Sequence, residues 1–240
     1  MKLENKVAVV TGASRGIGLE IALGFANEGA DLVVCARDVE RLQQLVLEIE
    51  ESGRRAFAVQ ADVSKETDVE RVVDGAIQEF GRIDVLCNNA GVSHTRQVDE
   101  MPLEEWDEII AVNLRGPFLL SRAVLPHMKK QNYGRIVHVS SMSSLMCAPG
   151  SAAYSASKAG LNALSLATAN ETSGHNILVN AMSPGFIKTD MNPVGSQPPS
   201  AAVPTAIDLA CLPDDGPSGR FFRFQEEVIV IPESSDAWKK

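Results

Sequence analysis

The sequence is short of the residues on which several classes of small protein depend. Its four cysteines stand apart and form no CxxC pair, which argues against a zinc ribbon or a disulfide scaffold and favours a reducing compartment. The four histidines show no metal-ligand spacing, so no metal site is expected. No uncharged apolar run approaches the roughly 18 residues of a membrane-spanning helix. A strand-like segment begins after six residues, which leaves no room for a signal peptide, and we expect a soluble cytoplasmic protein.

Positive charge is also scarce. The chain carries 22 basic and 31 acidic side chains, a formal net charge of −9, which argues against nucleic acid or an anionic membrane as a partner. With 240 residues, 45% of them hydrophobic, the chain can bury one large core that needs no disulfide bond or metal ion for stability. We therefore expect a single domain over residues 1–240.

What the sequence does contain is a regular alternation of two patterns. Short, uniformly apolar runs, typical of strands buried on both faces, occur at Val7–Thr11, Leu32–Ala36, Ala56–Gln60, Val85–Cys87, Ile136–Ser140 and Ile177–Ala181. Between them lie amphipathic stretches long enough for helices, at Gly18–Asn27, Val39–Ser52, Thr67–Phe80, Leu114–Lys130 and Ala153–Thr172. The alternation predicts an α/β fold: a doubly wound parallel sheet of about seven strands with helices on both faces.

The pattern changes after Ser183. Five prolines fall between Pro184 and Pro204, and residues 191–204 lack apolar periodicity, so we expect a short loop beside the substrate there. A short helix near Ala206–Leu212 and a last strand within Gly219–Ile231 should follow, and residues 232–240 should form a loose tail.

A glycine-rich turn follows the first predicted strand and opens a helix. The turn runs Thr11-Gly12-Ala13-Ser14-Arg15-Gly16-Ile17-Gly18, and its glycines permit a tight turn and a close backbone approach. The free N–H groups and the positive end of the helix attract a pyrophosphate. We expect the cofactor contacts of this turn to come from Gly12, Ser14, Arg15, Gly16, Ile17 and Gly18.

From this turn onward the chain resembles the short-chain dehydrogenase/reductase family, whose glycine motif has the form TGxxxGxG. The likeness covers about residues 5–190 and continues, in order, through Asn88-Asn89-Ala90-Gly91, Val112-Asn113, Ser140-Ser141, Tyr154-Ser-Ala-Ser-Lys158 and Pro184-Gly185. It implies a Rossmann-type fold and NAD(P)-dependent oxidation or reduction of a carbonyl or secondary alcohol. The ending, Leu212-Pro-Asp-Asp-Gly-Pro-Ser-Gly-Arg-Phe-Phe-Arg223, looks more like that of monomeric carbonyl reductases.

Tyr154 and Lys158 indicate proton transfer on chemical grounds as well. They are four residues apart in a segment that reads as helix, so their side chains share one face. An ammonium beside a phenol favours the phenolate, and together with an oxidised nicotinamide it should lower the pKa of Tyr154 by about 2–3 units from its usual value near 10. Tyr154 would then serve as proton donor and acceptor at neutral pH.

The resemblance assigns the remaining site residues. It implies that Ser141 hydrogen-bonds the substrate oxygen, that Lys158 contacts the nicotinamide ribose, and that Asn113 binds a water linking the lysine to solvent. A satisfied helix amide is the alternative role for Asn113. For the cofactor it implies contacts from Asp62, Val63, Asn89, Ala90, Gly91, Tyr154, Lys158, Pro184, Gly185, Ile187 and Thr189.

The choice between NAD(H) and NADP(H) depends on the end of the second strand, Cys35-Ala36-Arg37-Asp38. Arg37 can clamp a 2′-phosphate and Arg15 adds a second positive charge, whereas Asp38 could instead bind the ribose of NAD(H). The family register puts Arg37 at the deciding position and makes Asp38 the cap of the next helix, which favours NADP(H).

Three functions stay open at this point. A carbonyl reductase acting broadly on small substrates is the first expectation. The alternative is 3-oxoacyl-[acyl-carrier-protein] reduction, for which Lys129-Lys130 would be a basic landing patch for an acidic carrier. A catalytically idle nucleotide-binding regulator is the third. The resemblance also implies a homodimer or homotetramer paired through Leu114–Lys130 and Ala153–Thr172.

Overall fold

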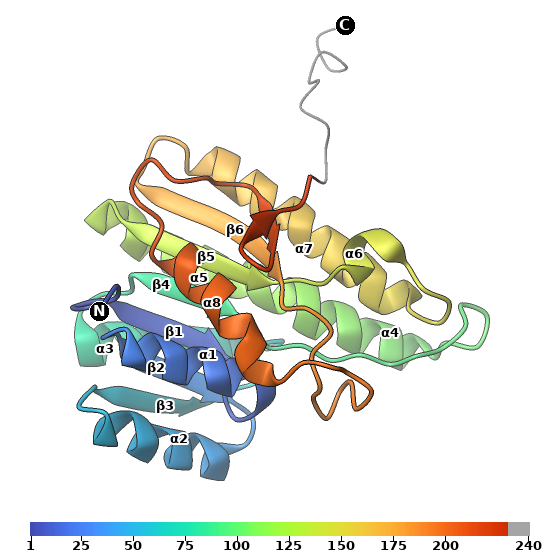
Figure 1. Ribbon diagram of the computed structural model, residues 1–240, viewed down its shortest axis with the longest axis horizontal. Coiled ribbons are helices and arrows are strands. Elements are labelled where there is room, and N and C mark those ends of the chain that lie inside the picture. The colour runs from blue at the N-terminus through green and yellow to red at the C-terminus, as the bar shows by residue number, and fades with distance from the viewer. Residues whose placement is uncertain (230–240) are drawn as a thin grey trace, which may run out of the picture.

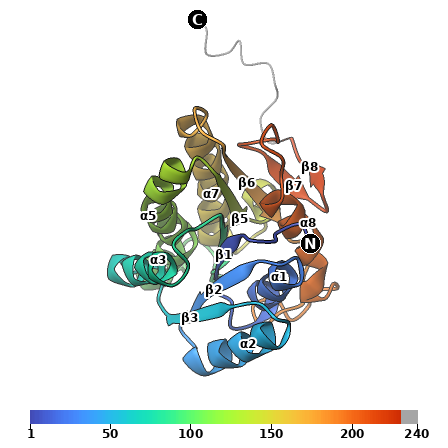
Figure 2. The same cartoon turned by 90° about the vertical axis from the view of Figure 1, so that its left-hand side faces the viewer.

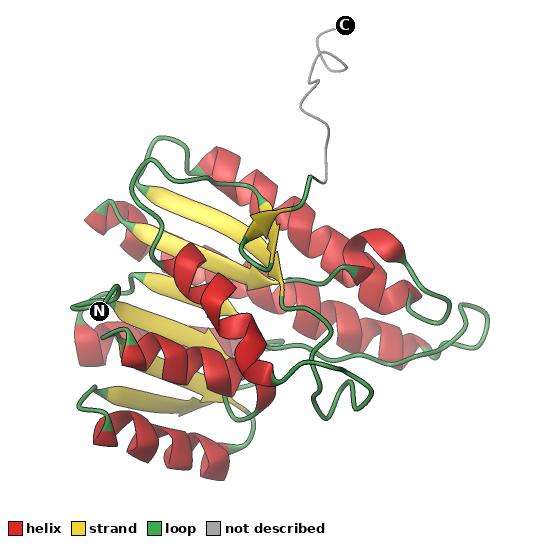
Figure 3. Cartoon of the chain, in the orientation of Figure 1, coloured by secondary structure: helices red, strands yellow, loops and turns green. Residues whose placement is uncertain are grey.

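All strands in the described part of the chain belong to one sheet. The structure is a computed structural model that describes residues 1–229, and its eight strands run in the order β3-β2-β1-β4-β5-β6-β7-β8 (Figures 1 and 3). Neighbouring strands are parallel except at the β7–β8 edge, where the pairing is antiparallel. The predicted doubly wound α/β fold is confirmed, with eight strands in place of about seven.

The element boundaries follow the sequence pattern closely. The strands are β1 Val7–Thr11, β2 Asp31–Ala36, β3 Ala56–Gln60, β4 Val85–Asn88, β5 Gly134–Val139, β6 Ile177–Ser183, β7 Phe221–Arg223 and β8 Glu226–Glu227. The helices are α1 Gly16–Asn27, α2 Val39–Glu51, α3 Glu66–Phe80, α4 Leu103–Ile110, α5 Gly116–Gln131, α6 Ser143–Met146, α7 Ala152–Glu171 and α8 Val203–Ala210. A π-helical turn, Ala111–Arg115, joins α4 to α5, and a 3-10 turn, Pro199–Ala202, precedes α8.

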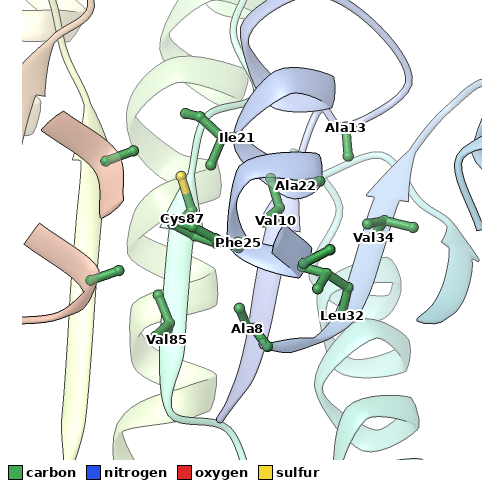
Figure 4. Packing of buried hydrophobic residues seen from close by; sticks show 14 of the residues in the cluster. Ala8, Val10, Ala13, Ile21, Ala22, Phe25, Leu32, Val34, Val85 and Cys87 are labelled. Carbon is green, nitrogen blue, oxygen red and sulfur yellow. The ribbon is translucent and has the colours of Figure 1, made fainter. Parts of the chain in front are cut away.

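Helices cover both faces of the sheet. Figure 2 shows α1, α2 and α8 on one face and α3, α5 and α7 on the other. Strand alternation divides the core accordingly, because Ala8 and Val10 of β1 face α1 while Val7 and Val9 face α3 and α5. On the α1 side of the sheet, Phe25 of α1 packs among side chains of β1, β2 and β4 (Figure 4). Burial on both faces explains why the strands read as uniformly apolar.

Several short elements were not predicted from the sequence. The chain turns back at Phe224 and Gln225, both at positive φ of 50° and 66°, and this hairpin adds β8. The one-turn helix α6 and the π-helical turn also lack a periodic apolar signal. Of the expected 191–204 loop, residues 199–204 are helical. The expected loose tail at 232–240 lies outside the described residues.

The longest helical stretch, Leu103–Gln131, is apolar enough to raise the question of a membrane span. Its most apolar 18-residue window has a mean hydropathy of 1.2, and half of that window is buried inside the protein. The buried side chains, among them Leu120, Val124 and Met128, belong to the core cluster beneath α3 and α5. This stretch therefore has the character of a core helix.

A buried histidine makes the stability of the fold depend on pH. His138 of β5 is fully buried beside Asn88, and burial, with a smaller effect of Lys158, lowers its pKa from 6.5 to about 3. Between pH 6.5 and about pH 3, the unfolded chain therefore binds one proton that the folded chain does not. The stability that the neutral His138 confers is complete above pH 6.5 and is lost as pH falls towards 3.

We predict that the His138 ring signals in NMR do not titrate between pH 7 and pH 4.5 while the protein stays folded. The free energy of unfolding should fall by about 2 kcal/mol from pH 7 to pH 5 on account of this group alone. A His138 titration midpoint near 6.5 would contradict the account.

Candidate active site

The glycine turn between β1 and α1 is shaped to receive an anion. Gly12 and Gly16 adopt positive φ values of 65° and 58°, and a Cβ on Gly18 would lie 2.3 Å from the Gly12 carbonyl oxygen. The side-chain amide of Asn89 donates to the carbonyl oxygens of Thr11, at 2.9 Å, and Gly12, at 3.3 Å, and so fixes the turn. Arg15, the residue before α1, makes no capping hydrogen bond, which leaves the first N–H groups of the helix to a ligand.

A cleft runs from this turn along the edge where the parallel strands end. Its cavity has a volume of about 680 Å³. The predicted residues that line it are Gly12, Ser14, Arg15, Gly16, Ile17, Arg37, Asp62, Val63, Asn89, Ala90, Gly91, Tyr154, Lys158, Pro184 and Thr189. Strand ends that are far apart in the sequence thus bring most of the expected cofactor residues to one cavity, as is usual for ligand sites of open α/β sheets.

Five predicted residues do not line the cavity. They are Gly18, which packs against the turn, Asn113 and Ile187, which are buried, and Ser141 and Gly185, which lie beside the lining residues of their loops. The cleft also takes in residues that the sequence did not single out, chiefly Arg41, Val92, Lys188 and Asp190. No local motif marks these residues, because only the tertiary fold brings them to the cavity wall.

The shape and the charge of this cavity both suit a dinucleotide. Glycines at 12, 16 and 18 leave room for phosphate oxygens to approach the backbone, and the N-terminus of α1 supplies a positive end. At the far end of the cavity Arg37 is exposed, and within residues 1–229 it takes part in no ion pair. The residues present therefore fit a nicotinamide dinucleotide.

Asp38 caps α2, as the family register predicts. Its carboxylate accepts a hydrogen bond from the Arg41 backbone N–H at 3.2 Å and forms an ion pair with the Arg41 side chain at 3.4 Å. This engagement leaves Arg37 as the free charged side chain at the tip of β2.

The residues expected to carry out proton transfer converge at the ends of β5 and α7. Tyr154 and Lys158 lie in the first turns of α7, and the Lys158 Nζ donates to the Val139 carbonyl oxygen at 2.8 Å, with 5.6 Å to the Tyr154 ring centroid. Ser141 follows β5, and its hydroxyl accepts from the Ser143 backbone N–H at 3.1 Å. Ser141 also lies close enough to Tyr154 for its side chain to lower the pKa of the phenol. A carbonyl oxygen could thus reach both hydroxyls.

Burial sets the pKa values of this group. Desolvation raises the pKa of Tyr154 above 10, and the Ser141 side chain lowers it by less. Desolvation also lowers the pKa of the fully buried Lys158 to about 8. Burial thus keeps the pKa of Tyr154 high in this structure, and the fall expected from the sequence is not seen.

Asn113 is placed by the π-helical turn that the sequence analysis missed. Its side-chain oxygen accepts from the Val92 backbone N–H at 2.8 Å, and its amide donates to the Val92 carbonyl, at 2.9 Å, and the Ser157 hydroxyl, at 3.1 Å. These bonds tie the loop after β4 to α7 behind Lys158. The water-binding role of Asn113 stays a prediction.

Metal chemistry finds no support in the described part of the chain. Residues 1–229 contain no cluster of three or more histidine, cysteine or acidic side chains that could hold a metal ion. His94 instead pairs with Glu108 at 2.8 Å.

Comparison with known proteins agrees with this geometry. The family model described as short chain dehydrogenase matches residues 6–198. The 3-oxoacyl-[acyl-carrier-protein] reductase FabG of Thermotoga maritima is 39% identical over 96% of this chain and 90% of its own length. A 3-oxoacyl-[acyl-carrier-protein] reductase of Synechocystis is 43% identical over 79% of this chain and 77% of its own length. A metagenomic short-chain oxidoreductase solved in complex with NADP is 37% identical, covers 93% of this chain and 98% of its own, and superposes with a TM-score of 0.83.

Proposed function

The chain belongs to the short-chain dehydrogenase/reductase family of nicotinamide-dependent oxidoreductases, and on this premise we propose that it reduces a 3-oxoacyl thioester to the 3-hydroxyacyl thioester with NADPH. The placement of Ser141 beside Tyr154, with Tyr154 and the neighbouring Ser140 lining the cofactor cleft, carries the proposal. The two relatives named as 3-oxoacyl-[acyl-carrier-protein] reductases support this substrate over the small carbonyl compounds of a carbonyl reductase, our first expectation.

NADP(H) is the preferred cofactor in this proposal. The free Arg37 guanidinium at the tip of β2 can bind a 2′-phosphate through two hydrogen bonds, and Arg15 lines the same cavity. Asp38, the residue that could favour NAD(H), is engaged in capping α2. The structural relative that holds NADP, at 37% identity, is consistent with this preference.

Tyr154 is the proton donor in the reduction. The nicotinamide, when bound, supplies the hydride that the substrate carbon accepts. With its pKa raised by burial, Tyr154 carries its proton on the phenol oxygen at neutral pH, ready for transfer to the substrate oxygen. Ser141 holds that oxygen by a second hydrogen bond and so orients the carbonyl.

Lys158 supports the tyrosine once the proton has left. Its Nζ is held by the Val139 carbonyl oxygen, so the ammonium keeps a fixed place near the Tyr154 ring. A positive charge there favours the phenolate, and with a pKa of about 8 the lysine can take up or release a proton near neutral pH.

The structure corrects the expected landing patch for a carrier protein. Lys129 and Lys130 end α5, just before β5 begins at Gly134, whereas Ser141 follows the other end of β5. Six residues of strand extend about 20 Å, so the two lysines lie at the edge of the sheet opposite to the catalytic residues. Within one chain, a carrier bound at these lysines would therefore lie at the edge of the sheet opposite to the catalytic residues.

The substrate is tested by comparing acetoacetyl thioesters with a small free ketone. We predict a kcat/KM at least about 100-fold higher for acetoacetyl linked to the carrier protein, or to its pantetheine arm alone, than for the ketone. The Lys129→Glu/Lys130→Glu variant should keep this preference, because both lysines are remote from the cleft. Equal kcat/KM values would favour the broad carbonyl reductase instead, and loss of the preference in the double variant would contradict the position assigned to the lysines.

A further inference from the structure

An ion pair connects the two walls of the cofactor cleft. The Arg15 Nη1 lies 3.1 Å from the Asp190 Oδ2, so the glycine turn after β1 is bridged to the loop after β6. The two segments also approach each other at a second point, since a Cβ built on Gly16 would lie 3.5 Å from the Thr189 side-chain atom Cγ2. Arg15 and Asp190 both line the cavity, so their ion pair forms part of its wall.

The three arginines at the adenosine end of the cavity differ in their partners. Within residues 1–229 Arg37 has no carboxylate partner, and Arg41 pairs with Asp38, the residue that caps its own helix. Only Arg15 is paired with a residue from a distant part of the chain. Both members of this pair are well exposed, with 61% of the Arg15 side chain and 74% of the Asp190 side chain accessible, so an entering anion can compete for Arg15.

We propose that Arg15 exchanges partners, binding the Asp190 carboxylate in the free protein and the 2′-phosphate of NADP(H) in the complex. Asp190 is then a specificity-determining residue that lies outside the 2′-phosphate site and acts on it through Arg15. The inference rests on the proposed preference for NADP(H). It adds that Asp190 reduces this preference by competing with the 2′-phosphate for Arg15.

The exchange favours the phosphate. A phosphate monoester carries a charge of about −1.5 to −2 and offers three acceptor oxygens, whereas the carboxylate carries −1. An exposed ion pair contributes little to stability and is screened by salt, so Asp190 holds Arg15 only weakly. Breaking the pair nevertheless weakens the binding of NADP(H). NAD(H), which has a hydroxyl at this position, leaves the pair intact and does not bear this cost.

The loop that carries Asp190 can keep its shape when the pair breaks. Thr189 and Asn192 exchange two backbone hydrogen bonds of 3.1 and 3.0 Å, and the Asn192 side chain donates to the Ile187 carbonyl oxygen at 2.9 Å. These bonds lie within the loop and do not involve Arg15. Replacing the Asp190 carboxylate by an amide should therefore alter the charge at the cleft without unfolding the loop.

The test is a set of equilibrium titrations of the purified protein with NADPH and NADH at low ionic strength. Asp190→Asn should tighten NADPH binding about two- to fivefold, the factor that corresponds to an exposed ion pair, and leave the dissociation constant for NADH unchanged. In the Arg15→Gln background the same Asp190→Asn change should have no effect on NADPH. Asp215→Asn is the matched control, because it removes an exposed negative charge beside Asp214, which binds Arg135 at the opposite edge of the sheet.

The outcomes separate this inference from the proposed function. If the wild-type protein prefers NADH, the proposed cofactor preference fails and the inference fails with it. If the wild type prefers NADPH but Asp190→Asn leaves its dissociation constant unchanged, or changes those of NADPH and NADH equally, only the exchange is overturned. An effect of Asp190→Asn that persists in the Arg15→Gln background overturns it as well.

Discussion

Replacing Tyr154 with phenylalanine is expected to lower kcat by about 10²- to 10⁴-fold, the range of general acid–base catalysis. The change removes the phenol oxygen that holds the proton and leaves the ring packed in α7. Because the glycine turn that would hold the cofactor phosphates follows β1 and is remote from the phenol oxygen, the dissociation constant for NADPH should change little. Steady-state kinetics with the acetoacetyl thioester, together with NADPH titration, measure both effects.

Tyr133 provides a matched control for this experiment, because it is the other of the chain's two tyrosines. It lies just before β5, at the edge of the sheet opposite to Tyr154, with its ring between Lys6 and Arg135. Tyr133→Phe keeps both ring contacts and should leave kcat within about twofold of the wild type. Near-normal turnover in Tyr154→Phe would remove Tyr154 from the mechanism.

Arg37→Asp is expected to turn the cofactor preference from NADPH towards NADH. The change removes a charge-assisted contact with the 2′-phosphate and places a negative charge opposite it. Loss of one such contact is worth about 1.5–3 kcal/mol, so NADPH affinity should fall by at least ten- to a hundredfold. NADH affinity should hold or improve, since a carboxylate at this position can accept hydrogen bonds from the ribose.

The control for this variant is Lys130→Asp, which makes the same change in net charge at the opposite edge of the sheet. It should leave both dissociation constants unaltered once the salt concentration is fixed. Equal loss of NADPH and NADH affinity in Arg37→Asp would show that Arg37 contacts a part of the cofactor that the two share, and would sink its role in selection.

Local sequence signals predicted the fold and much of the cleft. Apolar runs predicted the boundaries of β1 and β3 to the residue; β1 is buried on both faces, whereas β3 is the edge strand and is only partly buried. The glycine turn and the Asp38 cap were predictable as well, since turn and cap chemistry depends on a few adjacent residues.

Features that depend on distant parts of the chain were not predictable in this way. The Arg15–Asp190 pair joins two loops that meet only in the folded sheet, and neither loop carries a motif for the other. The pKa of Tyr154 was expected to fall because the sequence shows the nearby lysine and does not show the burial that raises this pKa. The place of Lys129 and Lys130 likewise follows from the direction of α5 relative to β5.

The most direct test of the account follows the hydride itself. The purified protein is incubated with acetoacetyl thioester and NADPH carrying deuterium at the transferable position of the nicotinamide, and the product is analysed by mass spectrometry. The account predicts a 3-hydroxybutyryl thioester with one deuterium on carbon 3, formed by the wild type and at least about 100-fold more slowly by Tyr154→Phe. Absence of the hydroxy product, or a product without the label, would contradict it.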